Sequence, residues 1–243
     1  MVTKKKILIV EDDHLIATIF RMFIKELNYD LIDIWSNSED AIKKIPALKP
    51  DIILMDILIN GQQDGIEVSE FITKEIDVPI IFITSNIEEE IVKRAVNANA
   101  YGFLVKPIDK KALGISIELA YRKHKSDIEL KKREYLLNSI INQSPDSIIV
   151  IHDEKIVFAN NKALELFNIS DFQKIIKKSI LDFFDEKHSV VLKSHIDKAI
   201  VDEKPIGAFS IQFSPMNKKS LEILIEGSVI KHNNENYIQL IMQ

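Results

Sequence analysis

Five residues with chemically useful side chains each stand at the end of a short apolar run: Glu11, Asp12, Asp56, Thr84 and Lys106. Three carboxylates held close together repel one another, so a cation is expected among them. Mg²⁺ prefers oxygen ligands and is usually held by one or two carboxylates plus a substrate phosphate. The ammonium of Lys106 and the hydroxyl of Thr84 suit an incoming phosphoryl group, and a carboxylate is a competent nucleophile for it. Asp56 is the best candidate for that nucleophile.

The elements that position these residues alternate regularly. Short apolar runs typical of buried strands cover 7–10, 31–35, 51–55, 79–83 and 101–105, and an amphipathic helical pattern follows each of them. This alternation predicts an α/β domain with a five-stranded parallel sheet covered by helices on both faces. Sites in such sheets form beyond the carboxyl ends of the strands, which is where the five polar residues are expected.

The composition limits the classes of function. Of 243 residues, 46% are hydrophobic and 28% charged, and the net charge of −5 argues against a strongly basic nucleic-acid-binding surface. The absence of cysteine excludes disulfides, thiolate metal sites and cysteine nucleophiles. The first apolar run is too short for a signal peptide, and no run reaches the ~18 residues of a membrane span. We therefore expect a cytoplasmic protein with no membrane span and no nucleic-acid partner.

A long helix is expected after the fifth strand, because no proline interrupts residues 110–142. One heptad position of this helix carries an apolar residue in three successive repeats: Tyr121, Ile128 and Tyr135. The second core position of the heptad carries polar residues instead: His124, Lys131 and Asn138. A strong coiled coil has apolar residues at both positions. Two readings stay open: a solvated connecting helix, or a weakly paired helix in a dimer.

The pattern changes after Ser144-Pro145. Strand-like runs cover 147–152, 155–159, 208–213, 220–229 and 237–242, and helical stretches cover 161–167, 171–177 and roughly 188–201. Short turns join neighbouring strands at 153–154, 215–217 and 233–234. Strands connected in this way favour an antiparallel sheet with helices on one side, an α+β domain.

Five separated motifs in the first half resemble, in order, the signature of the response-regulator receiver domain. They are ILIVEDD at 7–13, DIILMDI at 51–57, DGIE at 64–67, PIIFITS at 79–85 and GFLVKP at 102–107. The resemblance covers about residues 3–122. It implies a flavodoxin-like doubly wound fold and phosphorylation of Asp56 by a partner histidine kinase or phosphotransfer protein. It also implies Mg²⁺ bound by Glu11, Asp12, Asp56 and the backbone carbonyl of Leu58.

The same resemblance assigns roles at the carboxyl end of the sheet. Lys106 would contact the phosphoryl group, Thr84 would move towards it, Phe103 would swing inward, and the Lys106-Pro107 bond would be cis. The chain departs from the family at two points. Asn60 stands where the family often has proline shortly after the phosphorylated aspartate, so the loop differs. Phe103 replaces the frequent tyrosine and has no hydroxyl to donate.

Residues 156–167 and 175–184 resemble a PAS domain, over about residues 136–243. Asn160 and the following helix fit, while Asn168 and Lys178 stand where the family often has glycine. Asn168 still suits a helix end, because asparagine tolerates the left-handed conformation. The resemblance implies ligand sensing or dimerisation, with the ligand unknown. A flavin–cysteine adduct is excluded without cysteine, and His188 and His195 are expected to be solvated or capping residues rather than haem ligands.

These expectations divide the chain into a receiver domain (1–122), a connecting helix (123–143) and a PAS-like domain (144–243) that acts as sensor or dimerisation output. The expected function is that of a homodimeric two-component response regulator, which catalyses only its own phosphorylation and dephosphorylation. The alternative is the amino-terminal part of a longer hybrid sensor kinase or cyclase. A transcription factor ranks low, because no helix-turn-helix remains to be placed.

Overall fold

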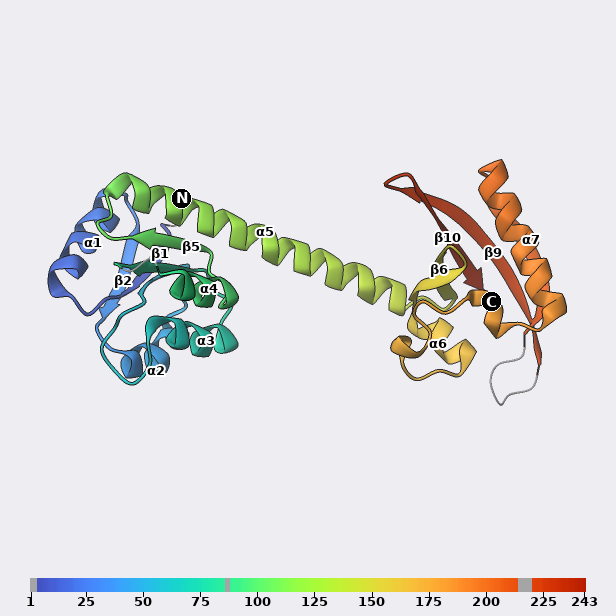
Figure 1. The fold of residues 1–243 in the computed structure, drawn as a ribbon, viewed down its shortest axis with the longest axis horizontal. Coiled ribbons are helices and arrows are strands. Elements are labelled where there is room, and N and C mark those ends of the chain that lie inside the picture. The colour runs from blue at the N-terminus through green and yellow to red at the C-terminus, as the bar shows by residue number, and fades with distance from the viewer. Residues whose placement is uncertain (1–3, 86–87, 214–219) are drawn as a thin grey trace. The chain divides into compact units, whose positions relative to one another are not determined.

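The computed structural model describes residues 4–85, 88–213 and 220–243. The chain forms two compact units, Met1–Lys131 and Lys132–Gln243, and each is considered by itself (Figure 1). Among the described residues, no helix combines the length and the apolar character needed to cross a bilayer.

The first unit contains the predicted parallel sheet. In the described part of the chain its strands lie in the order β2-β1-β3-β4-β5, and neighbouring strands are parallel throughout. Their bounds are β1 Lys6–Val10, β2 Asp30–Trp35, β3 Ile52–Asp56, β4 Ile80–Thr84 and β5 Gly102–Val105. The helices between them are α1 His14–Glu26, α2 Ser38–Leu48, α3 Gly65–Glu75 and α4 Glu89–Asn97. The predicted doubly wound fold is confirmed.

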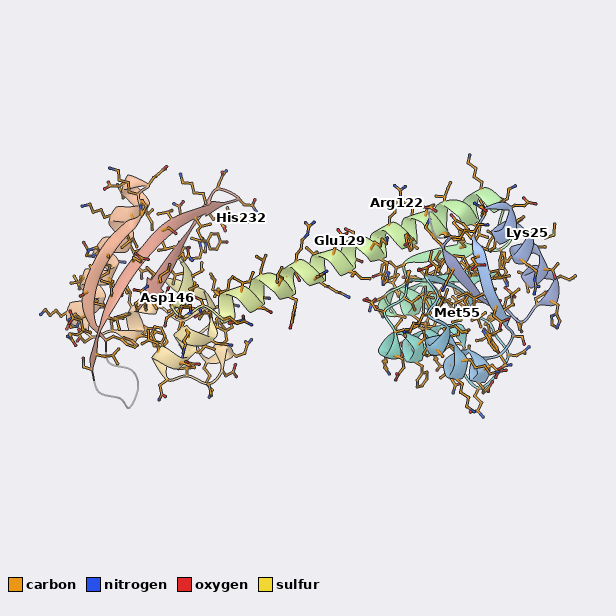
Figure 2. The ribbon with its side chains drawn as sticks, turned by 180° about the vertical axis from the view of Figure 1, so that it is seen from behind. Lys25, Met55, Arg122, Glu129, Asp146 and His232 are labelled. Carbon is orange, nitrogen blue, oxygen red and sulfur yellow. The ribbon has the colours of Figure 1, made fainter. Side chains whose placement is uncertain are left out.

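Helices cover both faces of this sheet (Figure 1). One core cluster combines side chains of α1 with those of α5 (Lys110–Asn142), and the other combines side chains of α2, α3 and α4. β3 and β4 are buried along their whole length, which explains why their sequences are continuously apolar rather than alternating. Met55 lies inside this unit (Figure 2).

Short polar side chains fix where the helices begin. Asp13 caps α1 by accepting hydrogen bonds from the backbone N–H groups of Leu15 and Ile16. Asp64 and Glu67 form a reciprocal capping box at the start of α3. Asn37 caps α2 through the N–H of Asp40.

The first part of α5 packs on the first unit. Its buried residues there are Leu113, Gly114, Ile117, Ala120 and His124. Tyr121 also packs against the core on this side of the sheet. Two residues expected along a paired-helix seam, Tyr121 and His124, are therefore occupied by contacts within their own chain.

The second unit is an antiparallel sheet with helices on one face. Its strand order is β7-β6-β10-β9-β8 within the described residues, with all neighbouring pairs antiparallel. The strands are β6 Ser147–His152, β7 Lys155–Ala159, β8 Ile206–Phe213, β9 Leu221–His232 and β10 Glu235–Met242. The helices are α6 Asn161–Phe167 and α7 Glu186–Asp202, with two 3₁₀ turns, η1 Phe172–Lys174 and η2 Ile180–Phe183. The predicted α+β domain is confirmed.

Most local predictions for this unit hold, and one is wrong. Asn168 ends α6 in the left-handed conformation, at φ 57°. The helix predicted over 171–177 is only the 3₁₀ turn η1. It ends because the chain turns back to β7, where the backbone N–H of Lys177 donates to the carbonyl of Ile156 and the N–H of Ile156 to the carbonyl of Lys178. The turn predicted at 215–217 lies outside the described residues.

Aromatic side chains contribute to the core of the second unit. The ring of Phe167 meets the rings of Phe183 and Phe213 edge to face, with centroids 4.8 and 4.9 Å apart. Of the two histidines considered as haem ligands, His188 contacts Asp185 at the start of α7 and His195 stacks on Phe209.

Candidate functional site

The carboxyl edge of the parallel sheet brings the predicted site residues together. Glu11 follows β1, Asp56 ends β3 and Lys106 follows β5. Ladder hydrogen bonds continue one residue past two strand ends, because the N–H of Glu11 donates to Trp35 O (2.9 Å) and that of Lys106 to Thr84 O (2.8 Å). The backbone that carries these side chains is therefore fixed by the sheet.

The ammonium of Lys106 lies between two buried carboxylates. Its Nζ is 2.7 Å from Asp56 Oδ2, 2.8 Å from Glu11 Oε2 and 3.0 Å from Glu11 Oε1. The side chains of Glu11, Asp56 and Lys106 are 1%, 6% and 13% exposed, so water screens these charges little. One positive charge thus faces two negative ones, and the cluster carries an excess of negative charge.

Asp12 adds a third carboxylate. Oxygen atoms of Glu11, Asp12 and Asp56 all lie within 4.8 Å of one another. Glu11 Oε2 is fully buried and makes no hydrogen bond within the described residues, although the charge of Lys106 is near it. A magnesium ion prefers oxygen ligands and is stabilised by excess negative charge, and the buried Glu11 oxygen is available to bind it. These residues therefore fit the implied metal.

The burial of this cluster changes its acidity. The pKa of Glu11 is raised to about 7, because burial and the nearby charge of Asp56 raise it by more than the hydrogen bond from Lys106 lowers it. Burial alone would lower the pKa of Lys106, but its bonds to Asp56 and Glu11 outweigh burial and hold the pKa above its ordinary value. Lys106 is therefore a permanent cation at this edge.

The remaining predicted residues surround this cluster. Thr84 is fully buried at the end of β4. Phe103 is half-buried in β5 and packs against the core shared with α2, α3 and α4. The side chain of Leu58 is exposed, and its backbone N–H donates to Asp56 Oδ1 at 3.2 Å. The Lys106-Pro107 bond is cis, as the resemblance implied.

The loop after Asp56 is held by a contact that the sequence analysis did not anticipate. The N–H of Ser38 donates to Asn60 O (2.9 Å), and the N–H of Gln62 donates to Glu39 Oε1 (3.1 Å). Gly61 between them has φ 126°, and a Cβ there would lie 2.0 Å from Ser38 Oγ. The start of α2 thereby anchors the loop that lacks the family's proline. In the sequence, the Asn60-Gly61 pair was the signal that could have indicated a tight turn here.

Gly65 has a separate steric role beside the site. A Cβ at Gly65 would lie 1.9 Å from the carbonyl oxygen of Asp56. The N–H of Gly65 also donates to Ile57 O at 2.8 Å. Only glycine lets α3 begin this close to the end of β3.

Comparison with known families agrees with this geometry. The family model described as the response regulator receiver domain matches residues 7–118. The model described as the PAS fold matches residues 135–243.

Individual relatives match the first unit. The transcriptional regulatory protein PdtaR of Mycobacterium tuberculosis is 30% identical over 116 residues, which are 48% of this chain and 56% of that protein. The regulatory protein LuxO of Vibrio cholerae is 32% identical over 130 residues, which are 52% of this chain and 28% of that protein. This chain thus spans less than two thirds of either relative.

A solved structure gives the same result. The signal receiver domain of a modulated diguanylate cyclase from Desulfovibrio desulfuricans G20 is 38% identical, with a TM-score of 0.50, over 51% of this chain and 99% of that one. Residues 7–118 therefore belong to the response regulator receiver family and residues 135–243 to the PAS fold.

Proposed function

We propose that the protein is a response regulator that accepts a phosphoryl group on Asp56 in a Mg²⁺-dependent reaction. The observation that carries this proposal is the position of Lys106 Nζ, 2.7 Å from Asp56 and 2.8 Å from Glu11, beside a cluster of three carboxylates. A fixed cation next to a nucleophilic carboxylate provides the positioning and charge stabilisation on which phosphoryl transfer depends. The family match of residues 7–118 supports the same chemistry.

Each residue has a distinct part in the proposed step. A carboxylate oxygen of Asp56 forms a bond to phosphorus while the bond from phosphorus to the donor breaks, and the donor keeps that electron pair. Lys106 balances negative charge on the phosphoryl oxygens, and the Thr84 hydroxyl donates a hydrogen bond to them. Glu11, Asp12, Asp56 and the backbone carbonyl of Leu58 would hold Mg²⁺, which supplies further positive charge to the phosphoryl group when bound.

The proposal extends to partners and assembly. The phosphoryl donor is a histidine kinase or a phosphotransfer protein, and the chemistry of the chain is limited to its own phosphorylation and dephosphorylation. The PAS domain senses a ligand or pairs two copies of the chain, so that the protein acts as a cytoplasmic homodimer. The receiver and PAS matches support this arrangement of input and output.

Mass spectrometry tests the phosphoacceptor directly. Incubation of the intact protein with acetyl phosphate and Mg²⁺ should add one phosphate, and Asp56→Asn should abolish the addition, because an amide is a poor nucleophile. Asp13→Asn is the matched control. Asp13 caps α1 and asparagine caps equally well, so this variant should still be phosphorylated. Phosphate incorporation into Asp56→Asn would refute the assignment.

A second candidate function has one observation in its favour. The receiver domain that is 38% identical to this chain comes from a modulated diguanylate cyclase. By analogy, the receiver–PAS pair would be the regulatory part of a longer cyclase or hybrid kinase. Sequencing the gene beyond codon 243 would separate the two candidates, because the second requires the reading frame to continue into a catalytic domain.

A further inference from the structure

The face of α5 that packs on the first unit changes character at His124. Up to Ala120 its buried residues are apolar or glycine. One turn later comes His124, whose side chain is 9% exposed and whose Nε2 lies 2.8 Å from Asp77 Oδ1. Asp77 belongs to the connection between α3 and β4. The helix therefore packs on the first unit through apolar side chains up to Ala120 and through a polar contact at His124.

Tyr101, directly before β5, joins this contact to the sheet. Its backbone N–H donates to Ile80 O (3.0 Å), and its hydroxyl donates to Asp127 Oδ2 (3.1 Å). Its ring meets the ring of His124 edge to face, with centroids 5.3 Å apart. Burial and the bond to Asp127 raise the pKa of Tyr101 to about 12, so its hydroxyl remains a donor at neutral pH. The tyrosine thereby connects a strand of the sheet to two residues of α5.

The group Asp77, Tyr101, His124 and Asp127 is called the α5 latch below. Its strength is modest. The side chain of Asp77 is 58% exposed, and exposed charged pairs contribute little to stability. Lys131 lies 4.0 Å from Asp77 and adds a further weak contact. A few polar bonds of this kind form a local element that opens more easily than an apolar core.

The latch and the candidate site lie at opposite ends of the same short strand. β5 has four residues, with Tyr101 directly before it and Lys106 directly after it. It is an edge strand that pairs only with β4 among the described strands. A displacement of Lys106 therefore reaches Tyr101 through a single strand with one neighbour.

We propose that the α5 latch holds residues 121–131 of α5 against the receiver, and that modification of Asp56 opens it. The second part rests on the proposed function of Asp56. A phosphoryl group on Asp56 changes the oxygen atoms that Lys106 contacts, which moves the end of β5. Tyr101 then leaves the position in which it meets His124 and Asp127. By thermodynamic linkage, loosening the latch must in turn favour the modified state by the same factor.

Hydrogen exchange of the unmodified protein, with both domains present, tests the first part. Tyr101→Phe removes one hydrogen bond, which should speed amide exchange in residues 121–131 about threefold to tenfold. Tyr135→Phe is the matched control, because Tyr135 is 75% exposed and its hydroxyl has no hydrogen bond within the described residues. Asp127→Ala, which removes the acceptor of the Tyr101 hydroxyl, and Glu129→Ala form a second pair on the same helix, since Glu129 is exposed and has no ion pair in the described structure (Figure 2). Equal exchange in both members of each pair would overturn the latch.

Beryllium fluoride with Mg²⁺, as a phosphoryl analogue, tests the second part. Bound analogue should speed exchange of 121–131 in the wild-type protein. Tyr101→Phe should bind the analogue severalfold more tightly than Tyr135→Phe does, as linkage requires. Analogue that binds without changing either quantity would overturn the coupling while leaving the proposed function intact. Failure of the wild-type protein to bind it would overturn the proposed function and the coupling together, and the variant pairs would still decide whether the latch exists.

Discussion

Glu11 combines nearly complete burial with a carboxyl group that contacts Lys106 and lies among the carboxylates that would hold a metal. Its pKa is raised to about 7, first by burial and then by Asp56. A carboxyl group with a raised pKa stays protonated until the pH approaches that value, and a proton competes with a metal for the same oxygen atoms. We therefore expect Mg²⁺ affinity to fall as the pH decreases below about 7, by up to tenfold per pH unit.

The single tryptophan can report this titration. Trp35 ends β2, and its carbonyl oxygen accepts the N–H of Glu11, so its fluorescence should respond to Mg²⁺. Glu11→Gln should weaken binding and flatten its pH dependence below 7, because the amide does not titrate. Asp13→Asn should retain the wild-type profile. An equally steep profile in Glu11→Gln would assign the titration to another group.

Lys106 allows a separate test of how the site communicates. Lys106→Ala should still accept one phosphate on Asp56, because the nucleophile and the carboxylates remain. The variant should lose the response to phosphorylation, since the contact between β5 and the phosphoryl group depends on that ammonium. The measurement compares the phosphorylation-induced change in sedimentation of the two proteins. Lys110→Ala, a half-exposed lysine paired with Glu26, is the control. An unchanged response in Lys106→Ala would contradict this role.

At the scale of elements, one buried asparagine connects four segments of the PAS domain. Asn160 is fully buried, and its Oδ1 accepts the N–H groups of Ile148 and Ala163. Its Nδ2 donates to the carbonyls of Ile141 and Asp146. Asn160→Ala leaves four backbone groups, one buried and three partly buried, without these partners, so we expect the free energy of unfolding of the PAS domain to fall by about 3 kcal/mol.

Chemical denaturation monitored by circular dichroism measures this loss. Asn161→Ala is a matched control, because Asn161 is exposed at the first position of α6. Its backbone N–H keeps the bond to Asn142 after the side chain is removed. Comparable losses in the two variants would show that the cost does not come from the four hydrogen bonds.

The sequence predicted elements better than contacts between them. Continuous apolar runs identified β3 and β4, because a strand buried on both faces needs such a run. The site at the carboxyl edge followed from the alternation of strands and helices along the chain. The latch could not be predicted, since His124 is polar and its burial depends on Asp77, 47 residues away. The failure at 171–177 has the same origin, because pairing with Ile156 overrides local helical propensity.

At the scale of the whole molecule, α5 contributes to both compact units. The seam expected from the heptad pattern begins at Tyr121, which packs on the receiver core. Of the other apolar side chains of the helix that are more than half exposed, three share one face by their spacing of seven and three residues: Leu130, Leu137 and Ile140. Tyr135 lies on a different face of the helix. The exposed stripe is therefore a better seam than the predicted one.

We expect a parallel homodimer whose helices meet along Leu137 and Ile140, because pairing removes this apolar stripe from water. Sedimentation at micromolar concentration tests the assembly. The protein contains no cysteine, so single-cysteine variants report the seam without background. Leu137→Cys should form an interchain disulfide on oxidation, and Tyr135→Cys, on another face and even more exposed, should not. Cross-linking at position 128 or 135 instead would show that the helices meet along the face of Tyr121, Ile128 and Tyr135. A strict monomer, with or without the phosphoryl analogue, would rule out pairing along either face.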